Sequence, residues 1–445
     1  MYDSGMAFPP PLSYTTQAGV TSNPLLLEQL LAPVSALLDG YVRGVRHGGA
    51  ISDPTYVRLG VLRIISQAVS GRDFLQQSAE TFGEPVVRST FFNTLHSVRR
   101  RSILGELNAQ LVVRSDVRRG DPRDDLLAAF PQLRDQAIFA VDGHQLAHAS
   151  HAGRDAKGYH VPGNTLFLLC LHSALVVNLG AVQGDGHHRH EMPVFRRRVV
   201  DWLAGRPVPE KQFPIFVADP AFVDKQFWTR MALWERTGAR VITRTKENMK
   251  PIVYNSRPWD PKDPVNLGVE ADESIGFDGA CIMRRVRYTD PETGMAYEFL
   301  TTVKDLPPGL IALLYLLRWR IEKLFDTGKN KLEERKGWAT GDVAHEIQAH
   351  FFALTHNLLV LLRRELERAH GIREVKVEEK RSKWLEERVQ IATESGRTVH
   401  PVQSLLPKVV QLTVQFIRTL RNGIWAQDRW ETVLPRFRAM LNAYL

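Results

Sequence analysis

The most informative segment of this 445-residue chain runs Tyr315-Leu316-Leu317-Arg318-Trp319-Arg320-Ile321-Glu322-Lys323-Leu324-Phe325-Asp326-Thr327-Gly328-Lys329. At about 100° per residue, a helix would place four polar side chains in a stripe about 60° wide: Tyr315, Arg318, Glu322 and Lys329. A second face is apolar and carries Leu314, Leu317, Ile321, Leu324 and Phe325. The segment therefore predicts a helix that buries one face. Its polar stripe is either a solvated surface with ion pairs or a functional site.

Upstream of this helix, two short apolar runs each lead into an aspartate. Residues 137–141 precede Asp142, and residues 214–218 precede Asp219. Unbroken runs of this length, alternating with helical patterns, indicate buried strands of a mixed sheet covered by helices. Ligands bind such sheets beyond the carboxyl ends of the strands, so the two aspartates would lie side by side if their strands pair. A single aspartate at a strand end is more often a turn or cap residue.

A third carboxylate near the two aspartates would favour a catalytic interpretation. Asp142, Asp219 and Glu322, converging at one edge of the sheet, could hold two divalent ions roughly 3.5–4 Å apart. Such ions activate a water or a 3′-hydroxyl and stabilise the leaving oxygen of a phosphodiester. The cations on the helix face of Glu322 could then bind the flanking phosphates.

The spacing of the polar stripe resembles a known signature. Tyr, two residues, Arg, three residues, Glu, six residues and Lys is the pattern of DDE transposases of bacterial insertion sequences, in the insertion sequence 4 group. The resemblance covers about residues 135 to 370 and includes Phe299-Leu300-Thr301-Thr302. It implies a ribonuclease H-like core, a β-strand insertion between the second aspartate and the glutamate, and cut-and-paste DNA transposition.

The resemblance also implies roles for individual residues. The metal-binding carboxylates of the family correspond to Asp142, Asp219 and Glu322, and its cofactor is Mg²⁺, with Mn²⁺ as a substitute and two ions per site. The family's contacts to the backbone of the transposon end correspond to Tyr315, Arg318 and Lys329.

The chain departs from the family pattern around both aspartates. Asp142-Gly143-His144 has no hydroxyl residue in third place, and Asp219-Pro220-Ala221-Phe222 matches the second motif only loosely. These departures concern the surroundings of the carboxylates and leave the carboxylates themselves in place.

An aromatic residue in the insertion is another candidate for DNA contact. In some relatives such a side chain stacks on a base flipped from the duplex, and Trp259 or Tyr254 could do this here. The alternative is that the aromatic residue anchors a small β core. We take Trp259 as the candidate DNA-binding residue of the insertion.

The whole chain is predicted to be an α/β protein, with a ribonuclease H-like mixed sheet flanked by helices, a β-strand insertion and helical N- and C-terminal regions. The predicted divisions are a loose tail at 1–22, a helical region at 23–130, a catalytic core at 135–245 and 305–370, a β-rich insertion at 246–304, and a helical region at 371–445.

Within the N-terminal region, a helix, a short turn containing Gly and Pro, and a second helix ending in Arg99-Arg100-Arg101 have the outline of a helix-turn-helix. Helical hairpins in ordinary cores have the same outline. Arg99 and Arg100 are therefore candidates for DNA contact, with packing as the alternative.

Composition limits the possible partners and compartment. Lys and Arg number 58 against 49 Asp and Glu, and the net charge of +9 permits a nucleic-acid partner. The two cysteines, Cys170 and Cys281, are too few for a disulfide framework or a structural zinc site. Neither an apolar run of about 18 residues nor a signal peptide is present, which predicts a cytoplasmic protein without a membrane partner.

A histidine-rich cluster, His187-His188-Arg189-His190-Glu191, suggests a metal site at first sight. Adjacent histidines do not converge as an i, i+4 pair on a helix does, so zinc is disfavoured and polar contacts to DNA are the alternative.

The function predicted from these residues is a transposase that binds the ends of an insertion sequence and cuts and transfers DNA strands with the help of metal ions. Its partner would be double-stranded DNA, both element ends and target. A homodimer would join two ends, and the bacterial nucleoid would be its location. The alternatives are a metal-dependent DNA nuclease on the same core and a non-catalytic DNA-binding regulator derived from a transposase.

Overall fold

The computed structural model describes most of the chain outside its first 22 residues. The described residues are 23–38, 51–68, 70–83, 85–116, 127, 130–147, 163–182, 191–204, 213–234, 238–277, 281–332, 335–369, 410–444 and isolated positions between 383 and 394. The predicted tail at 1–22 and the cluster His187–His190 lie outside the described residues.

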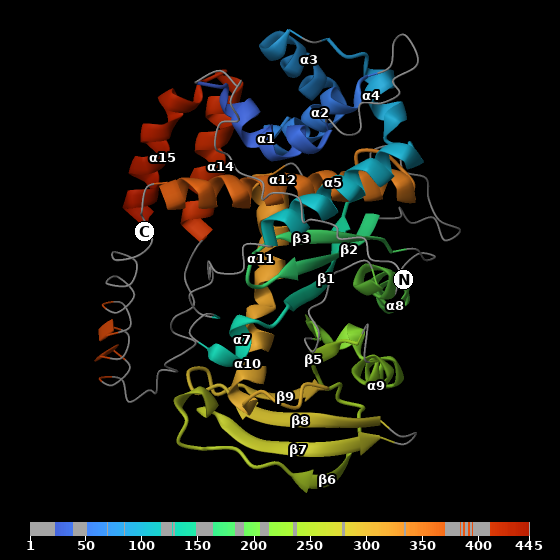
Figure 1. The fold of residues 1–445 in the computed structure, drawn as a ribbon, viewed down its shortest axis with the longest axis vertical. Coiled ribbons are helices and arrows are strands. Elements are labelled where there is room, and N and C mark those ends of the chain that lie inside the picture. Colours follow the sequence, from blue (N-terminus) through green and yellow to red (C-terminus); the bar gives the residue numbers. More distant parts are fainter. Residues whose placement is uncertain are drawn as a thin grey trace, which may run out of the picture.

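One sheet of nine strands forms the centre of the molecule, in the order β3-β2-β1-β4-β5-β9-β8-β7-β6 (Figure 1). Its first five strands are β1 (Ile138–Leu146), β2 (Gly163–Cys170), β3 (Val176–Ala181), β4 (Ile215–Ala218) and β5 (Arg240–Arg244). β1, β2 and β3 pair antiparallel, whereas β4 runs parallel to both β1 and β5. This is the ribonuclease H-like arrangement, so the predicted fold class is confirmed.

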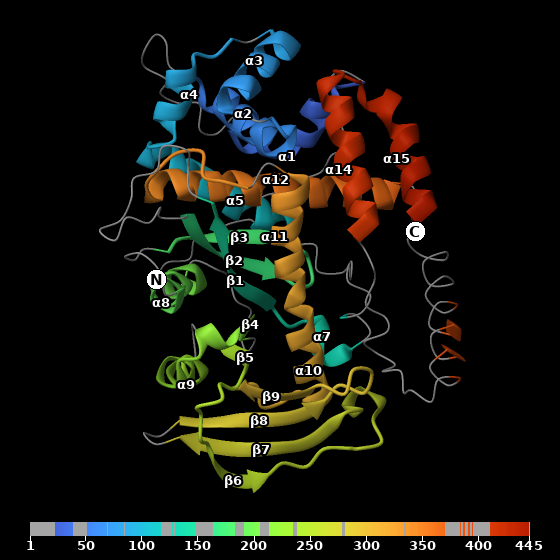
Figure 2. The same cartoon turned by 180° about the vertical axis from the view of Figure 1, so that it is seen from behind.

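The remaining four strands extend the same sheet. They are β6 (Ile252–Ser256), β7 (Val269–Phe277), β8 (Cys281–Thr289) and β9 (Ala296–Thr301). β9 pairs antiparallel with β5, which joins the insertion to the core as one continuous sheet (Figure 2). The turn between β8 and β9 lies at residues 291–294, where the Gly294 N–H donates to the Asp290 carbonyl at 2.8 Å. Gly294 has a φ of 69°, which glycine adopts without steric cost.

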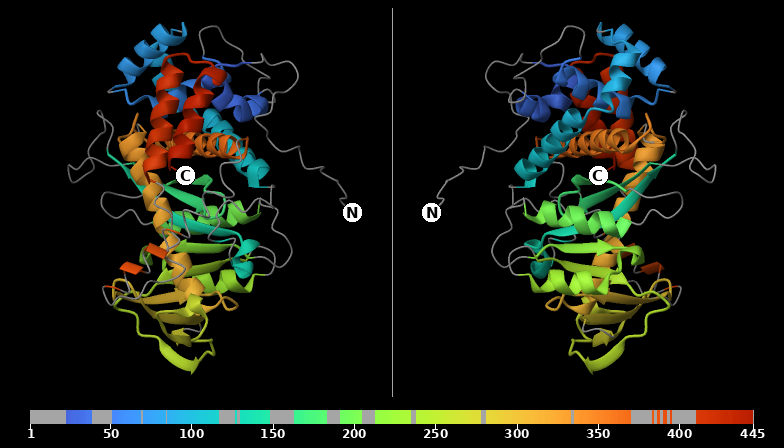
Figure 3. Two further views of the ribbon diagram at one scale, coloured as in Figure 1. Left: turned by 90° about the vertical axis from the view of Figure 1, so that its left-hand side faces the viewer. Right: turned by 90° about the vertical axis from the view of Figure 1, so that its right-hand side faces the viewer.

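Helices cover both faces of the sheet because side chains alternate along each strand. Ile138 and Ala140 of β1 face a core shared with α10 (Pro308–Leu317), α11 (Trp319–Lys331) and α12 (Asp342–Ala369). Phe139 and Val141 face a second core, shared with α8 (Glu191–Ala204) and α9 (Lys225–Leu233). Figure 3 shows these two layers from the side. The alternation directs Asp142 towards α11 and Gly143 towards α8.

The other helices form a body at one end of the sheet, which packs on the sheet through the long α12 and through α5 (Figure 1). They are α1 (Leu26–Leu38), α2 (Asp53–Ser66), α3 (Gly71–Phe82), α4 (Arg88–Thr94), α5 (Val98–Asp116), α14 (Val410–Trp425) and α15 (Trp430–Tyr444), while the short α7 (Pro131–Arg134) precedes β1. Segments from both ends of the sequence meet here. The Asn23 side chain accepts a hydrogen bond from the backbone N–H of Glu431 at 3.1 Å, in the first turn of α15.

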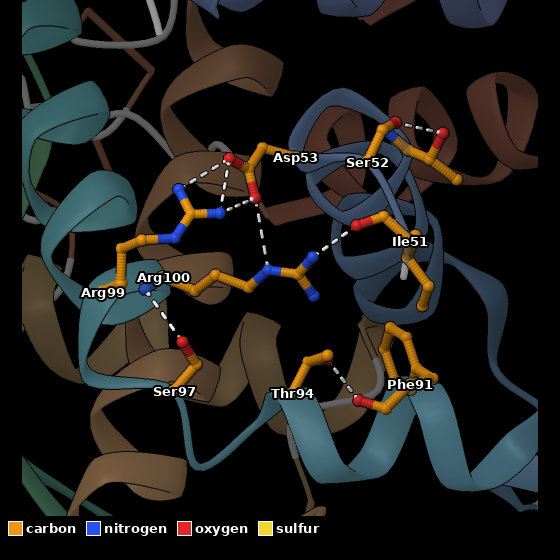
Figure 4. A network of polar contacts seen from close by, with 9 residues as sticks. Ile51, Ser52, Asp53, Phe91, Thr94, Ser97, Arg99 and Arg100 are labelled. Carbon is orange, nitrogen blue, oxygen red and sulfur yellow. Dashed lines mark hydrogen bonds and ion pairs between the residues drawn. The ribbon is translucent and has the colours of Figure 1, made fainter. Parts of the chain in front are cut away.

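The prediction of a helix ending in Arg99-Arg100-Arg101 is wrong. α4 stops at Thr94, and the three arginines stand in the first turn of α5 instead. Positive side chains there oppose the helix dipole, and a buried carboxylate, Asp53, compensates by binding Arg99 and Arg100 (Figure 4). None of the described helices is long and apolar enough to cross a membrane.

Candidate active site

Asp142 lies within β1. The sequence had instead predicted a strand that ends just before it. β1 continues to Leu146 because it pairs with β2 over its whole length, including Asp142 with Phe167. Its shorter parallel ladder with β4 stops at Val141 and Ala218. Asp142 and Asp219 are therefore the next residues along two neighbouring parallel strands, which brings them to the same edge of the ladder. One oxygen of Asp142, Oδ1, accepts a hydrogen bond from the Gly143 N–H at 2.9 Å.

Asp219 is held by the turn that follows β4. Its Oδ1 accepts from the Ala221 N–H at 2.8 Å and so caps the single 3₁₀ turn Pro220–Phe222. Its carbonyl oxygen accepts from the hydroxyl of Thr243 in β5 at 2.9 Å. Asp219 thus has the capping role that is the ordinary alternative for an aspartate at the end of a strand. The position also brings the carboxylate close enough to Asp142 for their charges to interact.

Glu322 lies in the first turn of α11 with its side chain one third exposed. The helix predicted through this segment is divided at Arg318 into α10 and α11, but Arg318 keeps helical angles, with φ −53° and ψ −33°. The predicted stripe therefore persists across the division from Arg318 to Glu322. The apolar face is buried as expected, including Ile321 and Phe325.

Arg318 connects the first and third carboxylates. Its Nη2 donates to Oε1 of Glu322 at 2.6 Å, and its Nη1 lies 3.4 Å from Oδ2 of Asp142. Its side chain is only 9% exposed. The resemblance had implied a contact between Arg318 and the DNA backbone, whereas the structure places the guanidinium among the carboxylates.

The environment of Asp142 favours binding of a cation. Its pKa is raised to about 6, mainly by burial and also by the negative charges of Asp219 and Glu322, while Arg318 and the Gly143 N–H oppose the shift. Crowded carboxylates in a poorly solvated position repel each other, and a positive charge relieves that repulsion.

The donor chemistry of the site fits Mg²⁺ or Mn²⁺, which prefer carboxylate oxygens. Asp142, Asp219 and Glu322 are the residues that could hold such ions. Among the described residues, however, no group of three or more His, Cys, Asp or Glu side chains is drawn together closely enough to bind a metal. Arg318 pairs with two of the three carboxylates.

A fourth carboxylate, Glu191, also belongs to this region. It is the first residue of α8, and its Oε1 accepts from Nδ2 of Asn164 at 3.3 Å. Its pKa is raised to about 7, mainly by burial and also by the charges of Asp142 and Asp219, while the hydrogen bond from Asn164 opposes the shift. Sequence reasoning considered Glu191 only as the end of the histidine cluster. It missed this position because Glu191 reaches β1 from the opposite face of the sheet, through the packing of α8.

His144, two residues after Asp142, stands where the family pattern has a hydroxyl residue. Its ring is buried and stacks on Phe325 and Phe352, at centroid distances of 4.6 and 5.6 Å. Among the described residues neither ring nitrogen has a hydrogen-bond partner. Burial lowers the pKa of His144 to about 3, so the ring is neutral and packs as an aromatic side chain.

Tyr315 and Lys329, the other members of the stripe, differ in exposure. Tyr315 is buried and packs on Phe299 at 5.1 Å, and burial raises the pKa of its hydroxyl. Lys329 is exposed, and its charge reaches His144. Among Tyr315, Arg318 and Lys329, the three residues expected to contact phosphates, Lys329 is therefore the one whose positive charge is exposed.

The remaining candidates for DNA contact lie elsewhere. Trp259 is partly buried and packs against the main core, which is the anchoring place named as its alternative, while Tyr254 of β6 is 58% exposed. Arg100 is buried, and the terminal nitrogens of Arg99 bind Asp53 (Figure 4). None of these four residues forms a hydrogen bond or ion pair with Asp142, Asp219 or Glu322 in the described part of the chain. A DNA contact by Arg99, Arg100 or Trp259 stays a prediction.

The fold and this group of carboxylates define the class of the protein: a ribonuclease H-like α/β protein with acidic side chains at the ends of its central parallel ladder. The family follows from sequence comparison. A family model described as "Transposase DDE domain" matches residues 133–358, more than half of the chain. The chain belongs to the DDE transposase family.

One solved structure, described as "Cryo-EM structure of piggyBac transposase synaptic complex with hairpin DNA (SNHP)", is similar to this chain with 13% identity and a TM-score of 0.41. The similarity covers 91% of this chain and 82% of that chain. No curated protein matches the sequence.

Proposed function

We propose that the chain is the transposase of a bacterial insertion sequence in the insertion sequence 4 group. It binds the ends of its element, cuts them and transfers the strands to target DNA, in the cytoplasm at the bacterial nucleoid. The observation that supports the proposal is that Asp142 lies near enough to Asp219 and Glu322 for their charges to interact, inside the segment that matches the DDE family.

The chemistry follows from the donor set. Two divalent ions, Mg²⁺ or Mn²⁺, would activate a water or a 3′-hydroxyl and stabilise the leaving oxygen. Asp142 and Asp219 offer oxygens from the sheet, and Glu322 offers its own from α11. Arg318 balances their charge in the free protein. Lys329, exposed on the same helix, binds a phosphate of the element end.

We assign separate tasks to the parts of the chain. Residues 135–245 and 305–370 form the catalytic core, and the insertion at 246–304 extends its sheet along the DNA. The helical regions at 23–130 and 371–445 bind the element end and a second copy of the chain. Two ends held together require two active sites, so the protein acts as a homodimer on DNA.

The test uses the full chain and the inverted repeats that flank its gene as cognate ends. Asp142→Asn, Asp219→Asn and Glu322→Gln should each abolish Mg²⁺-dependent cleavage while binding of the end persists. Asp326→Asn is the matched control, because Asp326 is an exposed carboxylate on the same helix, one turn after Glu322. Near-normal cleavage by one of the three variants would remove that residue from the site.

The same experiment separates the alternatives. A nuclease would cut the ends but would not join pre-cut ends to a target plasmid. A non-catalytic regulator would bind the ends without cleaving them in Mg²⁺ or Mn²⁺. Strand transfer of pre-cut ends, lost in Glu322→Gln, is the outcome that the proposal requires.

A further inference from the structure

We propose that Glu191 is a fourth carboxylate of the metal site and binds a divalent ion together with Asp142 and Asp219. The inference rests on the proposed function, because it assumes that the aspartates bind metal. It adds a ligand from the face of the sheet opposite Glu322.

The position of Glu191 is set by α8, which packs on the sheet through Val194, Phe195 and Val199. The carboxylate lies against Gly143, the residue after Asp142. A methyl group at position 143 would overlap Oε1 of Glu191, so the absence of a side chain there leaves room for the carboxylate. Glu191 thus reaches the backbone beside Asp142 although it belongs to a different layer.

A second observation at the same place is an unpaired oxygen. Asn164 of β2 is 2% exposed, and its Nδ2 donates to Glu191. Its Oδ1 has no hydrogen-bond partner among the described residues and lies 3.1 Å from the place that a Cβ on Gly143 would take. Buried carbonyl oxygens nearly always have a donor. A water bound to a metal ion would supply one here.

The negative charge of Glu191 is also not balanced by a Lys or Arg side chain of the described residues. Arg318 pairs with Asp142 and Glu322 on the α11 side. On the α8 side, no Lys or Arg of the described segments forms an ion pair with Glu191, which is largely buried and interacts with the charges of both aspartates. Buried carboxylates are normally paired or bound to metal, and a divalent ion would meet that requirement.

A purely structural role for Glu191 predicts a different result. A negative side chain at the first position of a helix stabilises it through the helix dipole. In that case Glu191→Gln would lower the melting temperature of the metal-free protein and leave its metal affinity unchanged. Metal affinity therefore distinguishes the two roles.

The experiment measures Mn²⁺ binding to the full chain by isothermal titration calorimetry at pH 7.5. Glu191→Gln should weaken binding at one site by at least about 10- to 100-fold, which is the usual loss when even a hydrogen-bond partner of a metal ligand is removed. Asp201→Asn, an exposed carboxylate on the same helix, should bind Mn²⁺ as the unsubstituted protein does. Unchanged affinity in Glu191→Gln would overturn the inference.

Two more variants keep the outcome clear. Gly143→Ala displaces the flexible end of Glu191 without removing its charge and should also weaken Mn²⁺ binding, which covers the case in which Glu191→Gln does not fold. Asp142→Asn should abolish binding. Binding that survives in Asp142→Asn would overturn the proposed metal site and this inference with it. Binding lost in Asp142→Asn but normal in Glu191→Gln and Gly143→Ala would overturn the fourth ligand alone.

Discussion

Nη2 of Arg318 lies 2.6 Å from Oε1 of Glu322, one helical turn further along the chain. The same guanidinium reaches Asp142 in β1, so a single buried cation links α11 to the centre of the sheet. Charge-assisted hydrogen bonds of this kind are about twice as strong as neutral ones. Arg318 is therefore a counter-ion for Asp142 and Glu322 within the protein itself. It relieves the repulsion between the carboxylates only in part, because the pKa of Asp142 is still raised.

The first prediction concerns stability without metal. Burial holds the pKa of Asp142 at about 6, above its ordinary value of 3.8. The folded protein then binds this proton more tightly than the unfolded chain, so the contribution of Asp142 to stability falls as the pH rises from about 4 to about 6. At pH 8 the charged carboxylate opposes folding. Asp142→Asn should raise the free energy of unfolding in EDTA by about 1–2 kcal/mol at pH 8, measured with urea.

Two control measurements test this prediction, one at low pH and one with added Mg²⁺. Near pH 4 the difference between Asp142→Asn and the unsubstituted protein should largely disappear, because the carboxyl is protonated in the folded state. Added Mg²⁺ should stabilise the unsubstituted protein at pH 8 and leave Asp142→Asn unchanged. A less stable Asp142→Asn at pH 8 in EDTA would show that its pairing with Arg318 outweighs the repulsion.

The second prediction separates two cations of the polar stripe. Lys329 is exposed, whereas Arg318 is buried among carboxylates. Each phosphate contact on duplex DNA contributes about 0.9 to the slope of log affinity against log salt. Lys329→Ala should therefore reduce the slope by about 1 in Ca²⁺-free binding assays. Arg318→Ala should change it by much less.

Lys323→Ala is the matched control, since Lys323 is exposed on α11 but lies off the stripe. It should leave the salt slope unchanged. Equal slopes for Lys329→Ala and Lys323→Ala would remove Lys329 from the DNA contacts.

Much of the site could be predicted because its signals are local. The apolar runs before Asp142 and Asp219 are short and continuous, and the helical spacing of Arg318 and Glu322 follows from 3.6 residues per turn. The ion partners of Arg318 were not predictable in this way, because one of them, Asp142, is 176 residues away in the chain. Glu191 depends on how α8 packs, which no short pattern encodes.

The N-terminal region illustrates the same limit. The run Arg99-Arg100-Arg101 is cationic, and from sequence a cationic run near a turn is a candidate for DNA binding. Its partner, Asp53, lies 46 residues earlier, at the start of α2. Hydrophobic periodicity indicates where the helices are but not which charged residues they bring together.

The third prediction tests whether these arginines are structural. Asp53 is 5% exposed and accepts hydrogen bonds from Arg99 at 2.8 Å and from Arg100 at 3.2 Å. The guanidinium of Arg100 also lies over the ring of Tyr56, 4.3 Å from its centroid. Asp53→Ala would leave the charge of Arg100 buried without its carboxylate, at a cost of about 3–5 kcal/mol in urea unfolding. Arg99→Ala should cost less than about 1 kcal/mol, because the Arg99 side chain is 61% exposed. Equal losses for the two variants would contradict this.

A buried ion pair connects two strands of the insertion to the loop that leads into α10 and α11. Arg284 of β8 donates from Nε and Nη2 to the two oxygens of Asp272 in β7, at 2.8 and 2.7 Å. Its Nη1 donates to the carbonyl oxygens of Val303 and Leu306, at 3.2 and 2.8 Å, just before α10 begins. The insertion therefore helps to set the start of the α10–α11 segment.

The fourth prediction is that Arg284 affects catalysis through this connection. Arg284→Ala frees the carbonyl oxygens of the loop before α10, and a displacement of Glu322 by about 1 Å can reduce a rate by about 100-fold. Arg285→Ala is the matched control, because Arg285 pairs with Glu273 at 2.7 Å across the same two strands, whereas the loop carbonyl oxygens accept from Arg284. Single-turnover cleavage of a cognate end in Mg²⁺ should fall at least about tenfold further in Arg284→Ala than in Arg285→Ala, with end affinity unchanged in both. Equal rates in the two folded variants would show that the insertion does not position Glu322.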